Sequence, residues 1–142
     1  MKYYVVIDTN VLVSAVLKSH SVPGSIVELA FDGPIIPILN EAIEKEYREV
    51  LSRPKFHLPE DLIEGIMSTF HKRAIYADAK HLDVELPDPK DLVFYEVVME
   101  ERKEEEAYLV TGNIRHFPNR PFIVTPREML DIILRDQDFR DE

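Results

Sequence analysis

The chain has 142 residues, which is the length of one ordinary domain and too short for two independent cores. It contains 27 acidic and 17 basic residues, for a formal net charge of −10, and it has no cysteine. These counts exclude a disulfide scaffold, a thiolate metal site and a cysteine nucleophile. They also argue against a basic domain held to nucleic acid by bulk charge, but they leave room for an acidic site that handles phosphate through metal ions.

The sequence contains no candidate for a membrane segment. No stretch approaches the roughly 18 apolar residues of a transmembrane helix, and the first apolar run, which ends at Asp8, is too short for a signal peptide. We therefore expect a soluble, cytoplasmic protein. No repeat or low-complexity linker divides the chain, so we expect one domain over 1–135 and a frayed tail over 136–142.

The first half of the chain alternates short apolar runs with amphipathic patterns. Asp8-Thr9-Asn10 ends the first run with residue types that cap helices, Asn40 can cap another helix, and Pro59 opens a further one. We expect strands over 3–7 and 35–39, and helices over 11–16, 22–31, 40–52 and 59–70.

The second half begins with a polar, poorly periodic connection over 76–87 that has room for one short strand. Asp88-Pro89-Lys90-Asp91 then starts a helix, and Thr125-Pro126 starts the last one. Between them we expect strands over 107–111 and 121–124.

Alternation of strands and helices predicts an α/β fold, with a parallel sheet between two layers of helices. Sites in such sheets lie at the carboxyl ends of the strands. Asp8 directly follows the first strand, and Thr111 and Asn113 follow a later one. Asp91 starts the helix before that later strand, so these residues can converge on one edge.

Asp8 has two interpretations. A carboxylate directly after an apolar strand is rigid and partly desolvated, which suits a hard cation such as Mg²⁺ or Mn²⁺. For an isolated Asp, capping of the following helix is the favoured alternative. Asn10 could likewise hydrogen-bond a ligating carboxylate or be an ordinary turn residue.

The other acidic candidates are equally open at this point. Glu44 and Glu46 flank the apolar stripe of the same helix, and periodicity cannot choose between them. Asp88 and Asp91 are three residues apart at a helix start, where either could be a cap. Basic residues near Glu46, among them Arg48 and Arg53, are either surface decoration or contacts for phosphate.

Five segments of the chain resemble, in order, the motifs of one family. They are VVIDTNVLVSA at 5–15, EYREVLSRPKF at 46–56, DPKDLVFYEVV at 88–98, LVTGN at 109–113 and IVTPREML at 123–130. On these motifs the chain resembles PIN-domain proteins, in particular the VapC-like ribonuclease toxins of toxin–antitoxin systems.

The resemblance implies a three-layer α/β/α sandwich and a ribonuclease that uses Mg²⁺ or Mn²⁺. It maps the acidic set onto Asp8, Glu46 and Asp91, with Asp88 close by, and so selects Glu46 over Glu44. The fourth metal position falls on Asn113, where relatives usually carry Asp, and His116 stands where they have a further Asp. One negative charge fewer should weaken metal binding. Asn10, Thr111, Arg48 and Arg53 are the residues we expect to position these groups or contact substrate.

The expected function is therefore metal-dependent hydrolysis of single-stranded or structured RNA, leaving a 5′-phosphate and a 3′-hydroxyl. The resemblance also implies a homodimer and an antitoxin protein as partner. The alternative is a PIN-like RNA-binding or scaffold protein with weak or no catalysis, which Asn113 motivates. A haloacid-dehalogenase phosphatase is disfavoured because it needs an acid where Asn10 stands, and no receiver-domain arrangement is present.

Overall fold

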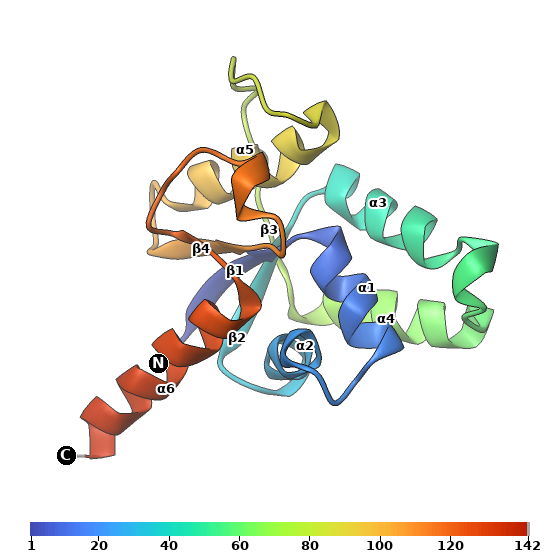
Figure 1. Cartoon of the computed structure of the whole chain (residues 1–142), viewed down its shortest axis with the longest axis horizontal. Helices are drawn as coiled ribbons and strands as arrows, with labels where there is room; N and C mark the ends of the chain where they lie inside the picture. Colours follow the sequence, from blue (N-terminus) through green and yellow to red (C-terminus); the bar gives the residue numbers. More distant parts are fainter. Residues whose placement is uncertain (142) are drawn as a thin grey trace.

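Parallel strands form a five-stranded sheet in the order β3-β2-β1-β4-β5 in the computed structural model, which describes residues 1–141 and side chains up to Gln137 (Figure 1). The strands are β1 (Tyr3–Ile7), β2 (Ile35–Leu39), β3 (Ile75–Tyr76), β4 (Ala107–Val110) and β5 (Ile123–Val124). The helices are α1 (Thr9–Leu17), α2 (Val22–Asp32), α3 (Glu41–Leu51), α4 (Glu60–Arg73), α5 (Leu92–Glu101) and α6 (Pro126–Asp141). Short 3₁₀ turns are η1 (Pro54–Phe56), η2 (Pro89–Asp91) and η3 (Ile114–His116).

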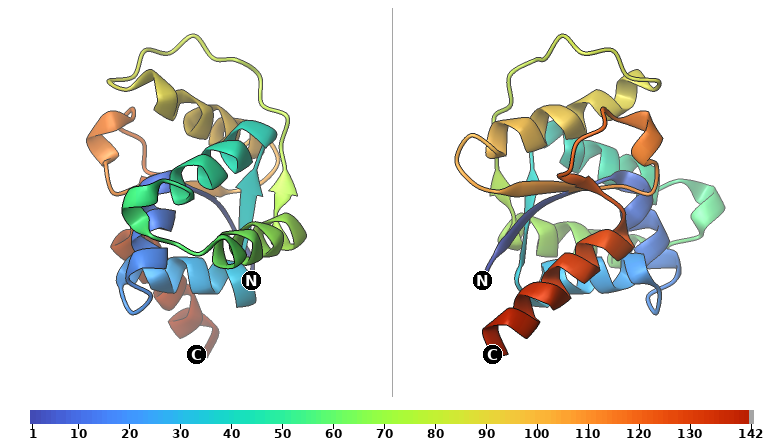
Figure 2. Two further views of the ribbon diagram at one scale, coloured as in Figure 1. Left: turned by 90° about the vertical axis from the view of Figure 1, so that its right-hand side faces the viewer. Right: turned by 60° about the vertical axis from the view of Figure 1, so that its left-hand side comes forward.

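The predicted three-layer α/β/α sandwich is confirmed. Helix α5 covers one face of the sheet, where it contacts β1, β2 and β4 (Figure 2). Helices α1, α2, α4 and α6 lie on the other face, with α2 and α4 packed on β2 and α6 packed on α2 and β5. Helix α3 contacts α1 and α4 from one layer and α5 from the other. It therefore lies where side chains from both layers meet.

The central strands are buried on both faces, which explains their uninterrupted apolar sequences. In each of β1 and β2, every residue but one is buried. The register pairs Ile7 of β1 with Val110 of β4 and Val5 of β1 with Pro37 of β2. Because all strands run the same way, the residues that follow β1 and β4 emerge at one edge of the sheet.

Arg73, at the end of α4, ties α4 to the end of α2. Its guanidinium donates to the carbonyl oxygens of Ala30 at 3.0 Å and Gly33 at 2.8 Å. These are carbonyls at a helix C-terminus, which have no partner within the helix itself. The contact holds the turn that leads from α2 into β2.

The structure differs from the sequence-based expectation at two places. The turn η2, capped by Asp88, precedes α5 where the sequence predicts a continuous helix from Asp88 onward. Strand β5 covers only Ile123–Val124 of the strand expected over 121–124. The backbone of α6 is helical to Asp141, and residue 142 lies outside the described residues; the frayed tail over 136–142 stays a prediction. The 127–141 segment contains no glycine or proline to end the helix, and Tyr3 donates to Asp136 at 2.9 Å.

Within the described residues, no helix is both long enough and apolar enough to cross a bilayer.

Candidate functional site

Asp8 is a buried carboxylate at the carboxyl edge of the sheet. Its exposed fraction is 4%. Its main-chain amide donates to the Val110 oxygen at 2.9 Å, and its Oδ2 accepts from the Thr111 hydroxyl at 2.7 Å. Asp8 is the N-cap residue of α1, but its side chain makes no capping hydrogen bond. The helix-cap interpretation therefore does not account for this carboxylate, which is held against the end of β4 instead.

Thr111 and the two asparagines complete the surroundings of Asp8. The Thr111 hydroxyl accepts from the Asn113 amide at 3.0 Å, so its own proton is committed to Asp8. Hydrogen bonding orients the Asn10 side chain so that its nitrogen lies 3.1 Å from Asp8 Oδ1 and its oxygen 2.6 Å from Asn113 Nδ2. Asn10, Thr111 and Asn113 thus lie together around Asp8.

Glu46 and Glu44 take different positions. Thr9, the first residue of α1, donates its hydroxyl to Glu46, which places Glu46 beside Asp8. Glu44 instead accepts from the Tyr76 hydroxyl at 2.8 Å and lies 3.6 Å from His71. The structure therefore distinguishes the two flanks of α3 that periodicity left equivalent.

Asp91, at the start of α5, is half-buried and pairs with a histidine. Its Oδ2 lies 3.4 Å from Nδ1 of His116 on η3. Asp88 is exposed, and its side chain accepts from the Lys90 amide at 3.0 Å, so it caps η2. The pair Asp88 and Asp91 thus divides into one capping residue and one residue that faces the η3 turn.

The charges of Glu46 and Asp91 both act on Asp8. The pKa of Asp8 is raised to about 6: burial is the largest cause, the charges of Asp91 and Glu46 also raise it, and hydrogen bonds from the Thr111 hydroxyl and the Thr9 amide lower it. Burial and the charge of Asp88 raise the pKa of Asp91, while His116 lowers it. A carboxylate whose ionisation is disfavoured by burial and by neighbouring carboxylates gains from a nearby cation.

Tyr47 is a member of this site that the sequence did not reveal. It belongs to the apolar stripe of α3, and it is fully buried. Its hydroxyl donates to the Ile7 carbonyl, directly before Asp8. Burial, together with the charges of Asp8 and Glu46, raises its pKa well above the ordinary value. A tyrosine on a buried stripe gives no sequence signal that its hydroxyl points to a site.

The side-chain oxygens around Asp8 are ligands of the kind that a hard divalent cation prefers, although the carboxylates do not yet form a metal-binding group. Among the described residues, no three acidic or histidine side chains already form a metal-binding group. Hydroxyl and imidazole partners, from Thr9, Thr111 and His116, hold the individual carboxylates. The oxygen donors nevertheless match the preference of Mg²⁺ and Mn²⁺.

The two arginines predicted near the site lie elsewhere. The Arg48 guanidinium forms an exposed ion pair with Glu64 of α4. Arg48 is two residues after Glu46, which places it about 200° further around α3, on the opposite face. Arg53 is exposed at the turn that precedes η1. Helix α3 thus turns Arg48 away from the flank where Glu46 lies, and Arg53 follows the end of that helix.

Comparison with known proteins gives two matches. A sequence model of the PIN domain matches residues 4–115, most of the chain. An uncharacterized protein of Methanocaldococcus jannaschii is 28% identical over 116 residues, which cover 80% of this chain and 72% of that protein. No solved structure is significantly similar to the chain. The matched range of the PIN domain contains Asp8, Glu46, Asp91 and Asn113 and ends before β5 and α6.

Proposed function

Because the chain belongs to the PIN-domain family, we propose that it is a metal-dependent endoribonuclease that hydrolyses phosphodiester bonds of RNA. One observation carries this proposal. Asp8, buried at the carboxyl edge of the sheet, has its pKa raised to about 6, and the charges of Glu46 and Asp91 contribute to that rise. The carboxylates of Glu46 and Asp91, from two separate elements, act on a third that is buried; this arrangement is unfavourable alone and becomes useful when the three share a divalent ion.

Asp8, Glu46 and Asp91 would hold Mg²⁺ or Mn²⁺, and the side-chain oxygen of Asn113 is available where relatives carry a fourth carboxylate. When bound, the ion would supply an activated water and neutralise charge on the phosphate. Thr111 positions Asp8 through the 2.7 Å hydrogen bond to its Oδ2. Asp88 is exposed and acts on the site through its charge on Asp91.

The surrounding polar groups fix the carboxylates before any ion arrives. Thr9 fixes Glu46, and Asn10 bridges Asp8 and Asn113. His116 lies beside Asp91, with its Nδ1 3.4 Å from the Asp91 carboxylate. This support by neighbouring side chains is what orients the ligands of a metal site.

The finer part of the proposal concerns biological role. We propose that the chain is the toxin of a toxin–antitoxin pair, acts as a homodimer on single-stranded or structured RNA, and is neutralised by an antitoxin protein. Resemblance to the motifs of VapC-like toxins supports this role. It covers the DTN segment at 8–10, the EYREVLSRP segment at 46–54 and the TPREM segment at 125–129.

Cleavage of a defined single-stranded RNA in Mn²⁺ or Mg²⁺ tests the activity. We expect fragments with 5′-phosphates from the original chain and none from Asp8→Asn or Asp91→Asn. Two matched variants serve as controls: Asp88→Asn, which keeps the cap of η2, and Glu44→Gln, on the flank of α3 that pairs with Tyr76. Both controls should retain most of the activity. Equal cleavage by the original chain, Asp8→Asn and Asp91→Asn would mean contamination and would end the assignment.

Asn113 favours a second function strongly enough to be tested beside the first. A neutral side chain at this position lowers the negative charge available for a metal, which fits an RNA-binding or scaffold protein with weak or no catalysis. Calorimetry with Mn²⁺ separates the two: metal binding without cleavage would support the second function, whereas metal binding with cleavage supports the first.

A further inference from the structure

Two hydrogen bonds join the turn that carries Asp8 to helix α3. Ile7, directly before Asp8, accepts at its carbonyl oxygen from the Tyr47 hydroxyl. Thr9, directly after Asp8, donates its hydroxyl to Glu46. Because Glu46 and Tyr47 are adjacent in α3, one turn of this helix is bonded to the residues on both sides of Asp8. We call these two hydrogen bonds the paired contact.

The Tyr47 hydroxyl supplies a hydrogen bond that strand pairing does not. The Ile7 carbonyl and the Asp8 amide belong to one trans peptide group, so they point in opposite directions. The amide donates to the Val110 oxygen of β4, and the carbonyl therefore faces away from β4. Pairing of β1 with β2, on that other side, reaches only Val5. Because Ile7 is 1% exposed, its carbonyl needs a partner, and the Tyr47 hydroxyl is that partner.

The Tyr47 hydroxyl is a firmly held donor close to the carboxylates. The ring of Tyr47 packs against Phe70 of α4, with the ring centroids 5.3 Å apart, and the side chain is fully buried. Burial, with the charges of Asp8 and Glu46, raises the pKa of this hydroxyl well above the ordinary value, so it keeps its proton and remains a donor. Tyr47 thus supports the site through the backbone of Ile7 and is not itself a proposed ligand.

We propose that Tyr47 is a positioning residue of the candidate metal site, which sets the separation of Asp8 and Glu46 through the neighbouring backbone carbonyl. Asp8 is held from the β4 side by the Thr111 hydroxyl, 2.7 Å from its Oδ2. The paired contact therefore governs how close α3, with Glu46, comes to Asp8. Without the Tyr47 hydroxyl, one hydrogen bond instead of two would join α3 to the turn, and the carboxylates would share a divalent ion less well. This role rests on the proposed function, since it concerns the ligands that the nuclease would use.

Calorimetric titration with Mn²⁺ tests this role in Tyr47→Phe, which keeps the ring and removes only the hydroxyl. The matched control is Tyr3→Phe, since Tyr3 lies at the other end of β1 and donates to Asp136 at 2.9 Å. We expect Tyr47→Phe to bind Mn²⁺ about tenfold more weakly, because side chains that orient metal ligands have effects of this size. Tyr3→Phe loses a hydroxyl of the same kind away from the site and should change the affinity by less than about twofold.

Thr9 provides a second test within the paired contact. Thr9→Val keeps a side chain of nearly the same size and removes the hydroxyl that donates to Glu46, whereas Thr9→Ser keeps a hydroxyl. We expect weaker Mn²⁺ binding in Thr9→Val and an affinity close to that of the original chain in Thr9→Ser. This pair of variants keeps the test decisive if Tyr47→Phe does not fold. Equal Mn²⁺ affinity of the two Thr9 variants would contradict the role of the paired contact.

A purely structural role for Tyr47 predicts a different result. It would lower the thermal stability in chelator and leave the Mn²⁺ affinity of the folded chain unchanged. With a positioning role, the Mn²⁺ concentration for half-maximal RNA cleavage should rise about tenfold in Tyr47→Phe, while the KM for RNA stays the same and excess Mn²⁺ restores the rate. Thermal melting in chelator establishes that each variant is folded at the temperature of the assay.

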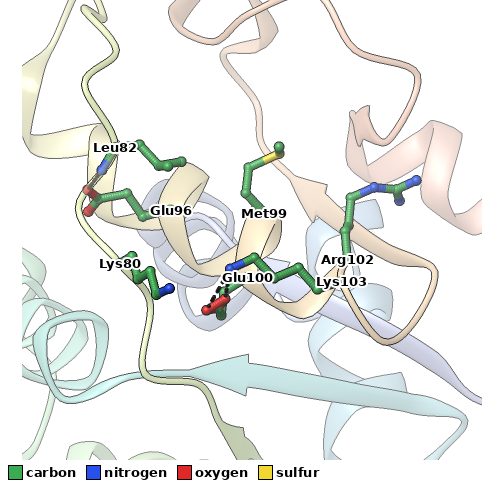
Figure 3. Close-up of a pocket in the computed structure, with 7 residues that line it drawn as sticks. All are labelled: Lys80, Leu82, Glu96, Met99, Glu100, Arg102 and Lys103. Atoms are coloured by element: carbon green, nitrogen blue, oxygen red, sulfur yellow. Dashed lines mark hydrogen bonds and ion pairs between the residues drawn. The ribbon is translucent and has the colours of Figure 1, made fainter.

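Weak Mn²⁺ binding by other carboxylates needs its own control. Glu100 is partly exposed near the end of α5, whereas Asp91 precedes the start of this helix. Figure 3 shows Glu100 at the border of a cavity of about 300 Å³, where it pairs with Lys103 at 2.7 Å. Because this carboxylate lies outside the candidate site, Glu100→Gln should change the Mn²⁺ affinity by less than about twofold.

The outcomes separate this role from the nuclease activity. Equal Mn²⁺ affinity of folded Tyr47→Phe and Tyr3→Phe would overturn the positioning role, whatever the cleavage result. An original chain that leaves RNA intact, but whose Mn²⁺ affinity falls in Tyr47→Phe, would support the positioning role and end the nuclease assignment. No Mn²⁺ binding by the original chain would overturn both.

Discussion

The buried charge of Asp8 lowers the stability of the metal-free fold, and a bound cation would compensate for it. Burial raises its pKa from 3.8 to about 6, so the folded chain holds a proton there more tightly than the unfolded chain does. The stability that this proton provides is fully present below about pH 4 and is lost as the pH rises through 6. The difference between the two pKa values corresponds to at most about 3 kcal/mol.

Replacing Asp8 by asparagine should therefore stabilise the metal-free chain. The amide oxygen of the introduced side chain can still accept from Thr111, and the buried charge is gone. In chelator we expect Asp8→Asn to gain about 1–3 kcal/mol at about pH 7.5 and roughly half as much at about pH 5. Denaturant unfolding at both values measures this. Asp88→Asn, at an exposed carboxylate, should gain nothing, and a less stable Asp8→Asn would contradict the argument.

Asn113 offers the opposite test at the same site. An aspartate at this position adds a negative charge beside Asn10, next to Asp8. We expect Asn113→Asp to bind Mn²⁺ about tenfold more tightly by calorimetry and to cleave RNA faster, because ligand charge governs affinity for hard cations. The same variant should be less stable than the original chain in chelator. Unchanged Mn²⁺ affinity would remove Asn113 from the proposed ligand set.

At the scale of the element, local patterns were enough for the sheet and not for the site. The strand at 3–7 was predictable because a centrally buried parallel strand is apolar throughout. The choice between Glu44 and Glu46 was not predictable, because both residues flank the apolar stripe of one helix. Only the contact of Thr9 with Glu46 and that of Tyr76 with Glu44 distinguish them. The arrangement of Arg48 with Glu64 likewise depends on how α4 packs beside α3, which periodicity does not contain.

Arg73 gives a prediction about how elements are joined. Its guanidinium donates to Ala30 and Gly33 at the end of α2, and a lysine ammonium cannot reach both in the same planar geometry. We expect Arg73→Lys to lower the free energy of unfolding by about 2 kcal/mol. Lys72→Arg, at the exposed neighbouring position, should change it by less than about 0.5 kcal/mol. Denaturant unfolding measures both changes. Equal changes in the free energy of unfolding for Arg73→Lys and Lys72→Arg would contradict the role of Arg73 in joining α4 to α2.

At the scale of the whole molecule, the net charge of −10 does not reveal that the carboxylates gather in separate groups. One group of carboxylates, around Asp8, lies at the start of α5, and another, around Glu101, lies at its end. The group around Asp8 suits a metal ion. A chain this acidic can therefore bind RNA in the proposed way only if divalent ions supply the positive charge at the site.

The chain should therefore bind RNA weakly until a divalent ion is supplied. In chelator, the carboxylates around Asp8 repel phosphate, and the acidic total provides no compensating field. With Mn²⁺ we expect the affinity for a hydrolysis-resistant phosphorothioate RNA to rise about tenfold or more, measured by fluorescence anisotropy at constant ionic strength. Asp8→Asn should show little of this rise. Tight binding in chelator, or an equal rise in Asp8→Asn, would show that RNA is held by another surface and not through the carboxylate site.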